Sequence, residues 1–170
     1  WQRQGNYMVF FPSYRLMEDV LQVYEEEFSV DWVRCVCQTP DMTEQEREGF
    51  LEEFQEREGT LVGFCVLGGI FSEGVDLTGE SLIGAVIVGT GLPQIGSQRE
   101  ILKEYYDKKN HCGFDYAYRY PGMNKVLQAA GRVIRTKEDK GVILLLDDRF
   151  WDRDYQEIFP REWQDRTGCR

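Results

Sequence analysis

Short apolar segments alternate with amphipathic segments along the whole chain, and this alternation limits the possible folds more than any other feature. Three nearly uninterrupted apolar runs have the length of strands, at Leu61–Leu67, Leu82–Val88 and Val142–Leu146. Strands that are buried on both faces of a parallel sheet have this composition. Tyr7–Phe11 and Trp32–Cys37 predict two further strands. Because helical patterns separate the strands, the sequence predicts an α/β fold with a doubly wound, mostly parallel sheet and helices on both faces. We expect the run at Val142–Leu146 to lie at the sheet centre.

Four helices are expected between these strands. Ser13 can cap a helix that runs to about Phe28, and the apolar stripe expected on it consists of Leu16, Val20, Val23, Tyr24 and Phe28. Thr43 and Glu46 have capping-box spacing, and Phe50, Leu51 and Phe54 follow on the inward face of that second helix. The other two helices are expected at Ser97–Lys109 and Met123–Ile134. We expect residues 1–170 to form one domain that is a fragment of a longer protein.

The formal net charge of −10 is unevenly distributed. Between Glu18 and Glu58 there are fourteen acidic and three basic residues, which leaves the rest of the chain nearly neutral. An acidic back face beside a neutral working face is compatible with local phosphate contacts, but it excludes tight DNA binding that is driven by net charge alone. No apolar run approaches the roughly 20 residues that span a bilayer, so we expect no membrane contact.

The five cysteines do not have the spacing of a metal site or a disulfide framework. No Cys-x-x-Cys pair occurs, and His111 is the one histidine that could assist them, so we expect no bound metal. An odd number of unpatterned cysteines predicts reduced thiols and a cytoplasmic protein.

The segment after the third expected strand has an unusual composition. Gly68, Gly69 and Gly74 allow the backbone to approach a ligand, and the polar residues between and after them are Ser72, Glu73 and Asp76. In parallel sheets, ligand sites form where such loops leave the carboxyl ends of strands. A plain crossover to the next strand is the alternative interpretation.

A second candidate lies near the end of the last expected helix. Gln128, Arg132 and Arg135 are spaced i, i+4 and i+7, so they would point from one helical face, and Gly131 reduces the bulk beside them. Arginine forks bind phosphate oxygens in bidentate fashion, which favours a polyphosphate ligand. Surface salt bridges to Glu138 or Asp139 are the alternative.

The third candidate is the junction of the first strand and its helix. The Ser13 hydroxyl and the amides at a helix start can hold a phosphate, and the Tyr14 ring can stack on a base. A helix cap beside a packed aromatic ring explains the same residues equally well.

Two signatures of a complete ATP hydrolase are missing from this sequence. It contains no Gly-x-x-x-x-Gly-Lys-Ser/Thr loop to cradle phosphates, and no strand that ends in an acidic pair followed by Ala-His to hold magnesium. Arginines without a phosphate cradle indicate a domain that supplies an arginine finger to a site completed elsewhere. We therefore expect the isolated chain to be inactive.

These candidate segments resemble helicase motifs of superfamily 2, in their usual order. Val126–Arg135 is similar to the motif Gln-x-x-Gly-Arg-x-x-Arg, and Phe71–Leu77 resembles the motif before it. Val9–Tyr14 and Gly91–Pro93 also fit, and Asp147–Phe150 points to the DinG/XPD-like branch, as does Asp139-Lys140-Gly141. The resemblance covers about residues 5 to 160 and is loose between Ser97 and Tyr120, where Tyr105–Asn110 is either a surface helix or a DNA-facing insertion.

The resemblance implies a RecA-like second motor domain that shares ATP and Mg²⁺ with a first RecA-like domain of the same polypeptide. Arg132 and Arg135 would reach the γ-phosphate, with Arg135 as the preferred finger, and Gln128 would contact the phosphate or its attacking water. Glu73, Gly74 and Asp76 would couple the nucleotide to the moving interface. Single-stranded DNA would contact the residues Ser13, Tyr14, Gly68, Gly69 and Ser72.

The family resemblance further implies 5′ to 3′ translocation in DNA repair or replication. Many members carry an iron–sulfur cluster in the first motor domain, but the cysteines of this chain do not reproduce its pattern, so we expect no cluster here.

Two other classes of function remain as alternatives. A non-catalytic module that binds nucleic acid or another protein could retain the fold, although it would not need Gln128, Arg132 and Arg135. A self-sufficient Rossmann-type enzyme would need Gly-x-Gly-x-x-Gly, and Gly89-Thr90-Gly91 lacks the third glycine.

Overall fold

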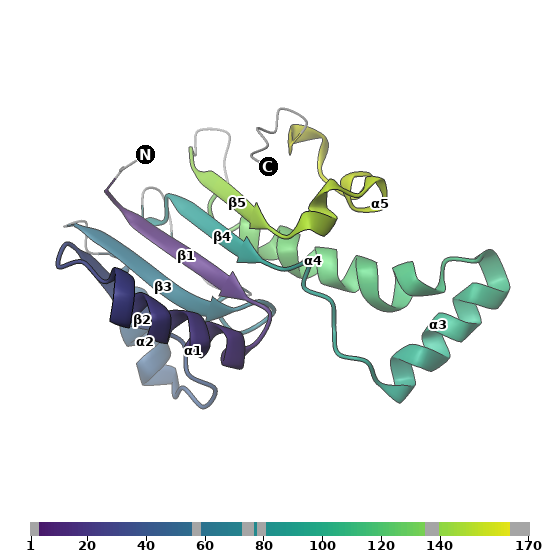
Figure 1. Ribbon diagram of the computed structural model, residues 1–170, viewed down its shortest axis with the longest axis horizontal. Coiled ribbons are helices and arrows are strands. Elements are labelled where there is room, and N and C mark those ends of the chain that lie inside the picture. The colour runs from purple at the N-terminus through teal and green to yellow at the C-terminus, as the bar shows by residue number, and fades with distance from the viewer. Residues whose placement is uncertain (1–3, 56–58, 73–76, 78–80, 135–139, 164–170) are drawn as a thin grey trace.

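Five parallel strands form a single sheet in the order β2-β3-β1-β4-β5 (Figure 1). The computed structural model describes residues 4–55, 59–72, 77, 81–134 and 140–163. The strands are β1 (Asn6–Phe11), β2 (Val33–Cys37), β3 (Thr60–Val66), β4 (Gly84–Val88) and β5 (Val142–Leu146). The longer helices are α1 (Tyr14–Val23), α2 (Glu44–Glu53), α3 (Ser97–Asn110) and α4 (Tyr120–Ala130). Shorter helical segments are η1 (Tyr24–Phe28), η3 (Asp115–Arg119), η4 (Asp148–Trp151), α5 (Arg153–Gln156) and η5 (Arg161–Trp163). The α/β prediction and all five strand positions are confirmed.

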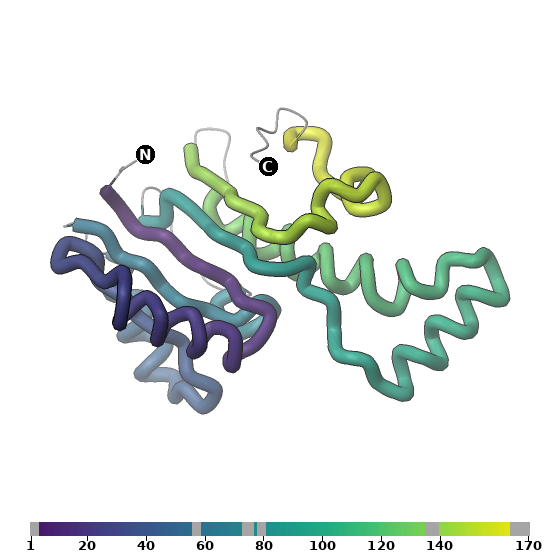
Figure 2. Tube along the Cα trace, viewed as in Figure 1, coloured from purple at the N-terminus to yellow at the C-terminus, as the bar shows by residue number. Residues whose placement is uncertain are grey.

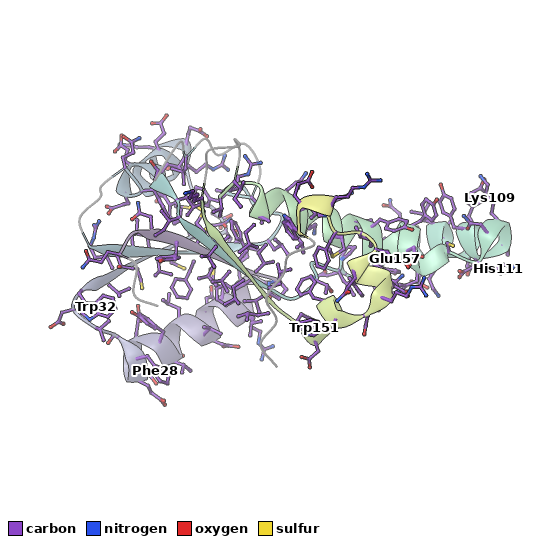
Figure 3. The ribbon with its side chains drawn as sticks, turned by 90° about the horizontal axis from the view of Figure 1, so that it is seen from above. Phe28, Trp32, Lys109, His111, Trp151 and Glu157 are labelled. Atoms are coloured by element: carbon purple, nitrogen blue, oxygen red, sulfur yellow. The ribbon has the colours of Figure 1, made fainter. Side chains whose placement is uncertain are left out.

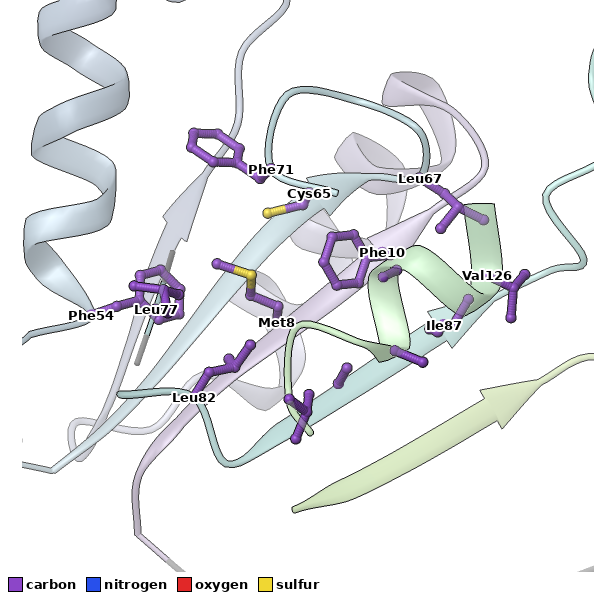
Figure 4. Packing of buried hydrophobic residues seen from close by; sticks show 14 of the residues in the cluster. Met8, Phe10, Phe54, Cys65, Leu67, Phe71, Leu77, Leu82, Ile87 and Val126 are labelled. Carbon is purple, nitrogen blue, oxygen red and sulfur yellow. The ribbon is translucent and has the colours of Figure 1, made fainter. Parts of the chain in front are cut away.

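Helices cover both faces of the sheet, as predicted. Helix α1 packs on one face, where Met17 contacts the stacked rings of Phe11 and Phe64. Helices α2 and α4 cover the other face and bury Met8 and Phe10 of the central strand (Figure 4). Because successive residues of β1 point to opposite faces, this strand serves both cores.

Gly63 in β3 allows α2 to approach the sheet closely. A Cβ atom at this position would lie 2.6 Å from Cζ of Phe54 and 3.2 Å from Cζ of Phe50. The two phenylalanine rings pack against each other with centroids 5.5 Å apart, and Phe54 is fully buried. The space that a side chain at position 63 would need is therefore occupied by the rings of Phe50 in α2 and of Phe54, its C-cap.

The apolar stripe predicted to face the core from the first helix is wrong except at Tyr24, whose partly buried ring lies 6.4 Å from the Phe64 ring. Leu16, Val20 and Val23 are 37%, 40% and 47% exposed, and Phe28 is 62% exposed. Met17 is the residue of α1 that is buried, because the helix is rotated so that the neighbouring stripe faces the sheet. The helix also changes to the π-helical segment η1 at Tyr24.

The central position predicted for the run at Val142–Leu146 is also wrong. This strand is β5, at the edge of the described sheet, and β1 occupies the centre. Ile143 and Leu145 pack on the core, whereas Val142, Leu144 and Leu146 are 60%, 48% and 46% exposed.

Helix α3 and the segment from η3 to α4 form a hairpin that projects from the sheet (Figures 1 and 2). Lys109 and His111 lie at its far end (Figure 3). His111 ends α3 in the left-handed conformation, with φ of 58°. Among the described residues, no helix is long and apolar enough to cross a membrane.

Replacing Gly63 with alanine tests this close packing. We expect Gly63→Ala to lower the free energy of unfolding by about 1–3 kcal/mol, because the new methyl group forces Phe54 out of its site. Gly49→Ala is the matched control: a methyl group there in α2 would meet nothing within 4 Å beyond its own stretch of helix, so alanine should stabilise by about 0.5–1 kcal/mol. Urea unfolding of both variants gives the comparison, and equal effects of the two substitutions would contradict the packing described here.

Candidate functional site

The first part of the connection from β3 to β4, residues 67–72, contacts helix α4 and the turn after it and brings two of the candidate segments together. At its start, Gly68 has φ of 76°, and a Cβ atom there would lie 2.8 to 3.2 Å from the end of the Lys125 side chain. Four residues later, the Ser72 carbonyl accepts a hydrogen bond of 3.2 Å from Nε of Arg132. The two contacts occur in the same order along residues 68–72 and along residues 125–132.

A tight turn closes the described part of this connection. The backbone amide and the hydroxyl of Ser72 both donate to the Gly69 carbonyl, at 3.0 and 2.8 Å. Ser72 is fully buried, and the neighbouring Phe71 ring stacks on Phe50 with centroids 4.1 Å apart. The turn therefore presents the Ser72 carbonyl to Arg132, while its hydroxyl is engaged inside the turn.

The helix predicted to run to Ile134 is shorter than expected, and the shared face predicted for Gln128, Arg132 and Arg135 stays a prediction because Arg135 lies outside the described residues. Helix α4 ends at Ala130, and Gly131 caps it, so Arg132 lies in the turn that follows. Gln128 is exposed and Arg132 is half-buried. The other predicted site residues, Arg135, Glu73, Gly74 and Asp76, lie outside the described residues, as do Glu138 and Asp139 of the salt-bridge alternative.

Ser13 and Tyr14 lie at the start of α1, next to the carboxyl edge of the sheet. Ser13 is the N-cap, and its hydroxyl accepts from the Leu16 amide at 3.3 Å. The Tyr14 hydroxyl accepts from Nε2 of Gln38 at 2.8 Å. Burial raises the pKa of the Tyr14 phenol, so the ring stays neutral near pH 7. The helix cap and the packed ring are thus present, and a DNA contact of these residues stays a prediction.

Sequence reasoning missed Lys125 and Gln38. Lys125 brings its ammonium group to the Gly68 turn, which suits an anionic ligand, and its spacing from Gln128 and Arg132 is a helical signal that could have identified it. Gln38 is 2% exposed and reaches residues far from it in the sequence. No local pattern could have identified Gln38.

Asp147 and Arg149 form a charged pair at the carboxyl end of β5. The Asp147 carboxylate accepts from Nε and from a terminal nitrogen of Arg149, at 2.8 and 2.7 Å. It also caps η4 by accepting from the Arg149 amide at 3.0 Å. The Arg149 side chain is the main cause that lowers the pKa of Asp147. This fixed pair lies near Gly89, which is also next to Pro12.

The projecting hairpin carries a group of tyrosine rings. Tyr106 stacks on Tyr116 with centroids 4.0 Å apart, and the Lys109 ammonium lies 5.7 Å from the Tyr105 ring. Tyr105 is 56% exposed. The segment Tyr105–Asn110 therefore belongs to a surface helix, and its contact with DNA stays an alternative prediction.

Within the described part of the chain, no group of three or more His, Cys, Asp or Glu residues could hold a metal ion. Burial raises the pKa of Cys35, Cys37 and Cys65, which keeps these thiols protonated. The groups suited to an anion are instead Lys125, Gln128 and Arg132.

Comparison with protein families gives a match over nearly the whole chain. Residues 2–166 match the model of the helicase C-terminal domain. A regulator of telomere elongation helicase 1 homolog of Drosophila persimilis is 30% identical over 178 residues, which cover 96% of this chain and 17% of that protein. The homolog of Culex quinquefasciatus is 31% identical over 161 residues, with 86% and 16% covered. The chain thus spans about a sixth of the length of these relatives.

Solved structures show the same architecture. An XPD helicase superposes with a TM-score of 0.70 and 26% identity, over 92% of this chain and 27% of the other. An XPD structure without ligand gives a TM-score of 0.69 at 24% identity, over 90% and 30%. The predicted RecA-like fold is confirmed.

The Asp147–Arg149 pair gives a pH-dependent prediction. Because the folded pKa of Asp147 is lowered, the pair stabilises the fold above the unfolded pKa, and this contribution is lost as the pH falls through the folded pKa. We expect Asp147→Asn, which keeps a capping side chain, to lower the free energy of unfolding by about 0.5–1 kcal/mol at pH 7. The difference should shrink below about pH 4.

Urea unfolding at pH 7 and pH 3 measures this effect. Asp148→Asn removes the neighbouring exposed charge and serves as the control. If Asp147→Asn lowers the free energy of unfolding by the same amount at both pH values, the ion pair is not the cause of the loss.

Proposed function

The chain belongs to the helicase C-terminal domain family, in its DinG/XPD-like branch of superfamily 2, and on this basis we propose that it is the second motor domain of an ATP-dependent 5′ to 3′ DNA helicase. In this role it supplies an arginine finger and contacts to single-stranded DNA. It couples ATP hydrolysis to translocation in DNA repair or replication. The relatives named above are helicases, and one group of them is named for telomere elongation.

The hydrogen bond between Arg132 and Ser72 is the observation that best supports this proposal. It joins two segments that are 60 residues apart and that carry adjacent helicase motifs. An arginine held in this way is oriented before any ligand binds, which reduces the entropy lost on binding phosphate. Lys125 adds a second cation, on helix α4, which precedes the turn that carries Arg132.

ATP and Mg²⁺ would bind between this domain and the first RecA-like domain of the same polypeptide. The missing phosphate loop would come from that first domain, which also supplies the magnesium ligands. Arg132 and Gln128 would contact the phosphates from this side, with Arg135 as the finger. Glu73, Gly74, Asp76 and Gly131 would shape the coupling segments. Arginine stabilises the charge that develops on the transferred phosphoryl group.

Single-stranded DNA would follow the carboxyl edge of the sheet. Ser13 and Tyr14 lie there at the start of α1, and the Tyr14 hydroxyl is linked through Gln38 to Gly69. Backbone amides at the start of α1 suit a phosphate, and the Tyr14 ring suits a base. Ser72 would act through the turn that it closes.

A non-catalytic module that binds nucleic acid or protein is the second candidate. The exposed rings of the hairpin favour it, because such a surface could bind a partner without ATP. The two candidates differ in one result: replacing the arginines would reduce ATP turnover of the intact protein if it is a motor, but not if it is such a module.

Removing the proposed finger should abolish ATP turnover in the intact protein. We expect Arg135→Ala to reduce DNA-stimulated ATP hydrolysis by about three to five orders of magnitude, because an arginine finger stabilises transition-state charge. Arg153→Ala is the control, since this arginine is exposed and pairs with Glu157 on the same helical segment. Near-normal turnover of Arg135→Ala, with normal folding, would remove Arg135 from the mechanism.

Ser13→Ala should weaken single-stranded DNA binding by about two- to tenfold, which corresponds to one hydrogen bond. The substitution also removes a helix cap, so Thr43→Ala, which removes the cap of α2, is the matched control. Fluorescence anisotropy of a labelled oligothymidylate measures both. If the two variants bind equally well, Ser13 acts only as a cap.

A further inference from the structure

Gln38 is a polar side chain that is buried at the meeting point of three segments. It follows the last residue of β2 and is 2% exposed. Its own amide donates to the Phe64 carbonyl at 2.8 Å, which extends the pairing of β2 with β3 by one residue. A glutamine is costly to bury unless its amide group is hydrogen-bonded.

Both ends of the Gln38 amide are hydrogen-bonded. Oε1 accepts from the backbone amide of Val66 at 3.0 Å, at the end of β3. Nε2 donates to the Tyr14 hydroxyl at 2.8 Å, in the first turn of α1. One side chain therefore links the ends of two segments, with sequence separations of 28 and 24 residues.

The same amide also lies against Gly69. A Cβ atom on Gly69 would lie 2.9 Å from Nε2 and 3.3 Å from Oε1 of Gln38. The Gly69 carbonyl in turn accepts from the amide and the hydroxyl of Ser72, whose own carbonyl accepts from Arg132. Direct contacts thus run from Tyr14 through Gln38, Gly69 and Ser72 to Arg132.

Each contact in this series is directional or tightly packed. If the turn at Gly69 shifts, the Gln38 amide must move or lose a hydrogen bond, and an unpaired buried amide is unfavourable. A shift at Arg132 therefore has a physical route to the Tyr14 ring.

We propose that Gln38 is a positioning residue that couples the Tyr14 edge of the domain to the turn that orients Arg132. The assignment of DNA to one end and ATP to the other rests on the proposed function. The mechanical link between the two ends belongs to the domain itself and can be tested without either ligand.

The functional test is the ratio of ATP turnover with oligothymidylate to turnover without it, in the intact protein. We expect Gln38→Leu to reduce this ratio about fivefold or more, the range of typical coupling between sites. A merely structural role would lower both rates together and leave the ratio unchanged. Gln22→Leu is the control, because Gln22 is exposed and bonds only to Glu26 among the contacts described here.

Combining Tyr14→Phe with Gln38→Leu tests whether the coupling passes through the hydrogen bond between these two side chains. If coupling passes through the bond to the Tyr14 hydroxyl, Tyr14→Phe lowers the ratio in the parent protein but causes no further decrease in Gln38→Leu. An equal decrease in both backgrounds would show that the two residues act independently, and the proposal would fail.

Hydrogen exchange tests the mechanical link without DNA or ATP. In Gln38→Leu, we expect faster deuterium uptake both in residues 11–17 and in residues 66–72, and no change in Gln22→Leu. Faster uptake confined to residues 66–72 would overturn the link. An intact parent protein without DNA-stimulated turnover would refute the proposed function, and the exchange result would still decide the role of Gln38.

Discussion

The connection between β3 and β4 is the feature on which the rest of the site depends. In a parallel sheet, every connection must return from the carboxyl edge to the amino edge. At the start of this connection, Gly68 lies against Lys125 of α4 and the Ser72 carbonyl accepts a hydrogen bond from Arg132, in the turn after α4. These two contacts join the segment after β3 to α4 and to the turn that follows it, and Gln38 links the same segment to Tyr14 at the carboxyl edge. Polar side chains from three separate segments, Tyr14, Gln38 and Arg132, are thereby connected through the turn that follows β3.

Much of the fold followed from the sequence, because strand length and alternation are local properties. The errors concern choices that depend on tertiary packing. Two apolar stripes on α1 are compatible with helical spacing, and Met17 rather than Leu16 faces the sheet. An apolar run such as Val142–Leu146 fits a central strand, yet here it is an edge strand of the described sheet. The pattern of apolar residues on a strand does not specify which strands lie beside it in the sheet.

The candidate site was predicted in part, for a related reason. The motif residues Gln128 and Arg132 were identified from spacing, but the end of α4 at Ala130 changes how they are presented. Lys125 could have been identified from its helical spacing, whereas Gln38 acts through contacts with residues more than 20 positions away, which leave little trace in one sequence. A cytoplasmic location and the single-domain boundary remain predictions.

The central claim is that this domain supplies half of a motor. Its most direct test is ATP hydrolysis in the presence of single-stranded DNA, first by this chain alone and then by the chain joined to the proposed first motor domain. We predict no turnover by the chain alone and strong DNA-stimulated turnover by the joined protein. Turnover by the isolated chain would show that it has its own phosphate cradle, and would contradict the account of an incomplete ATP site.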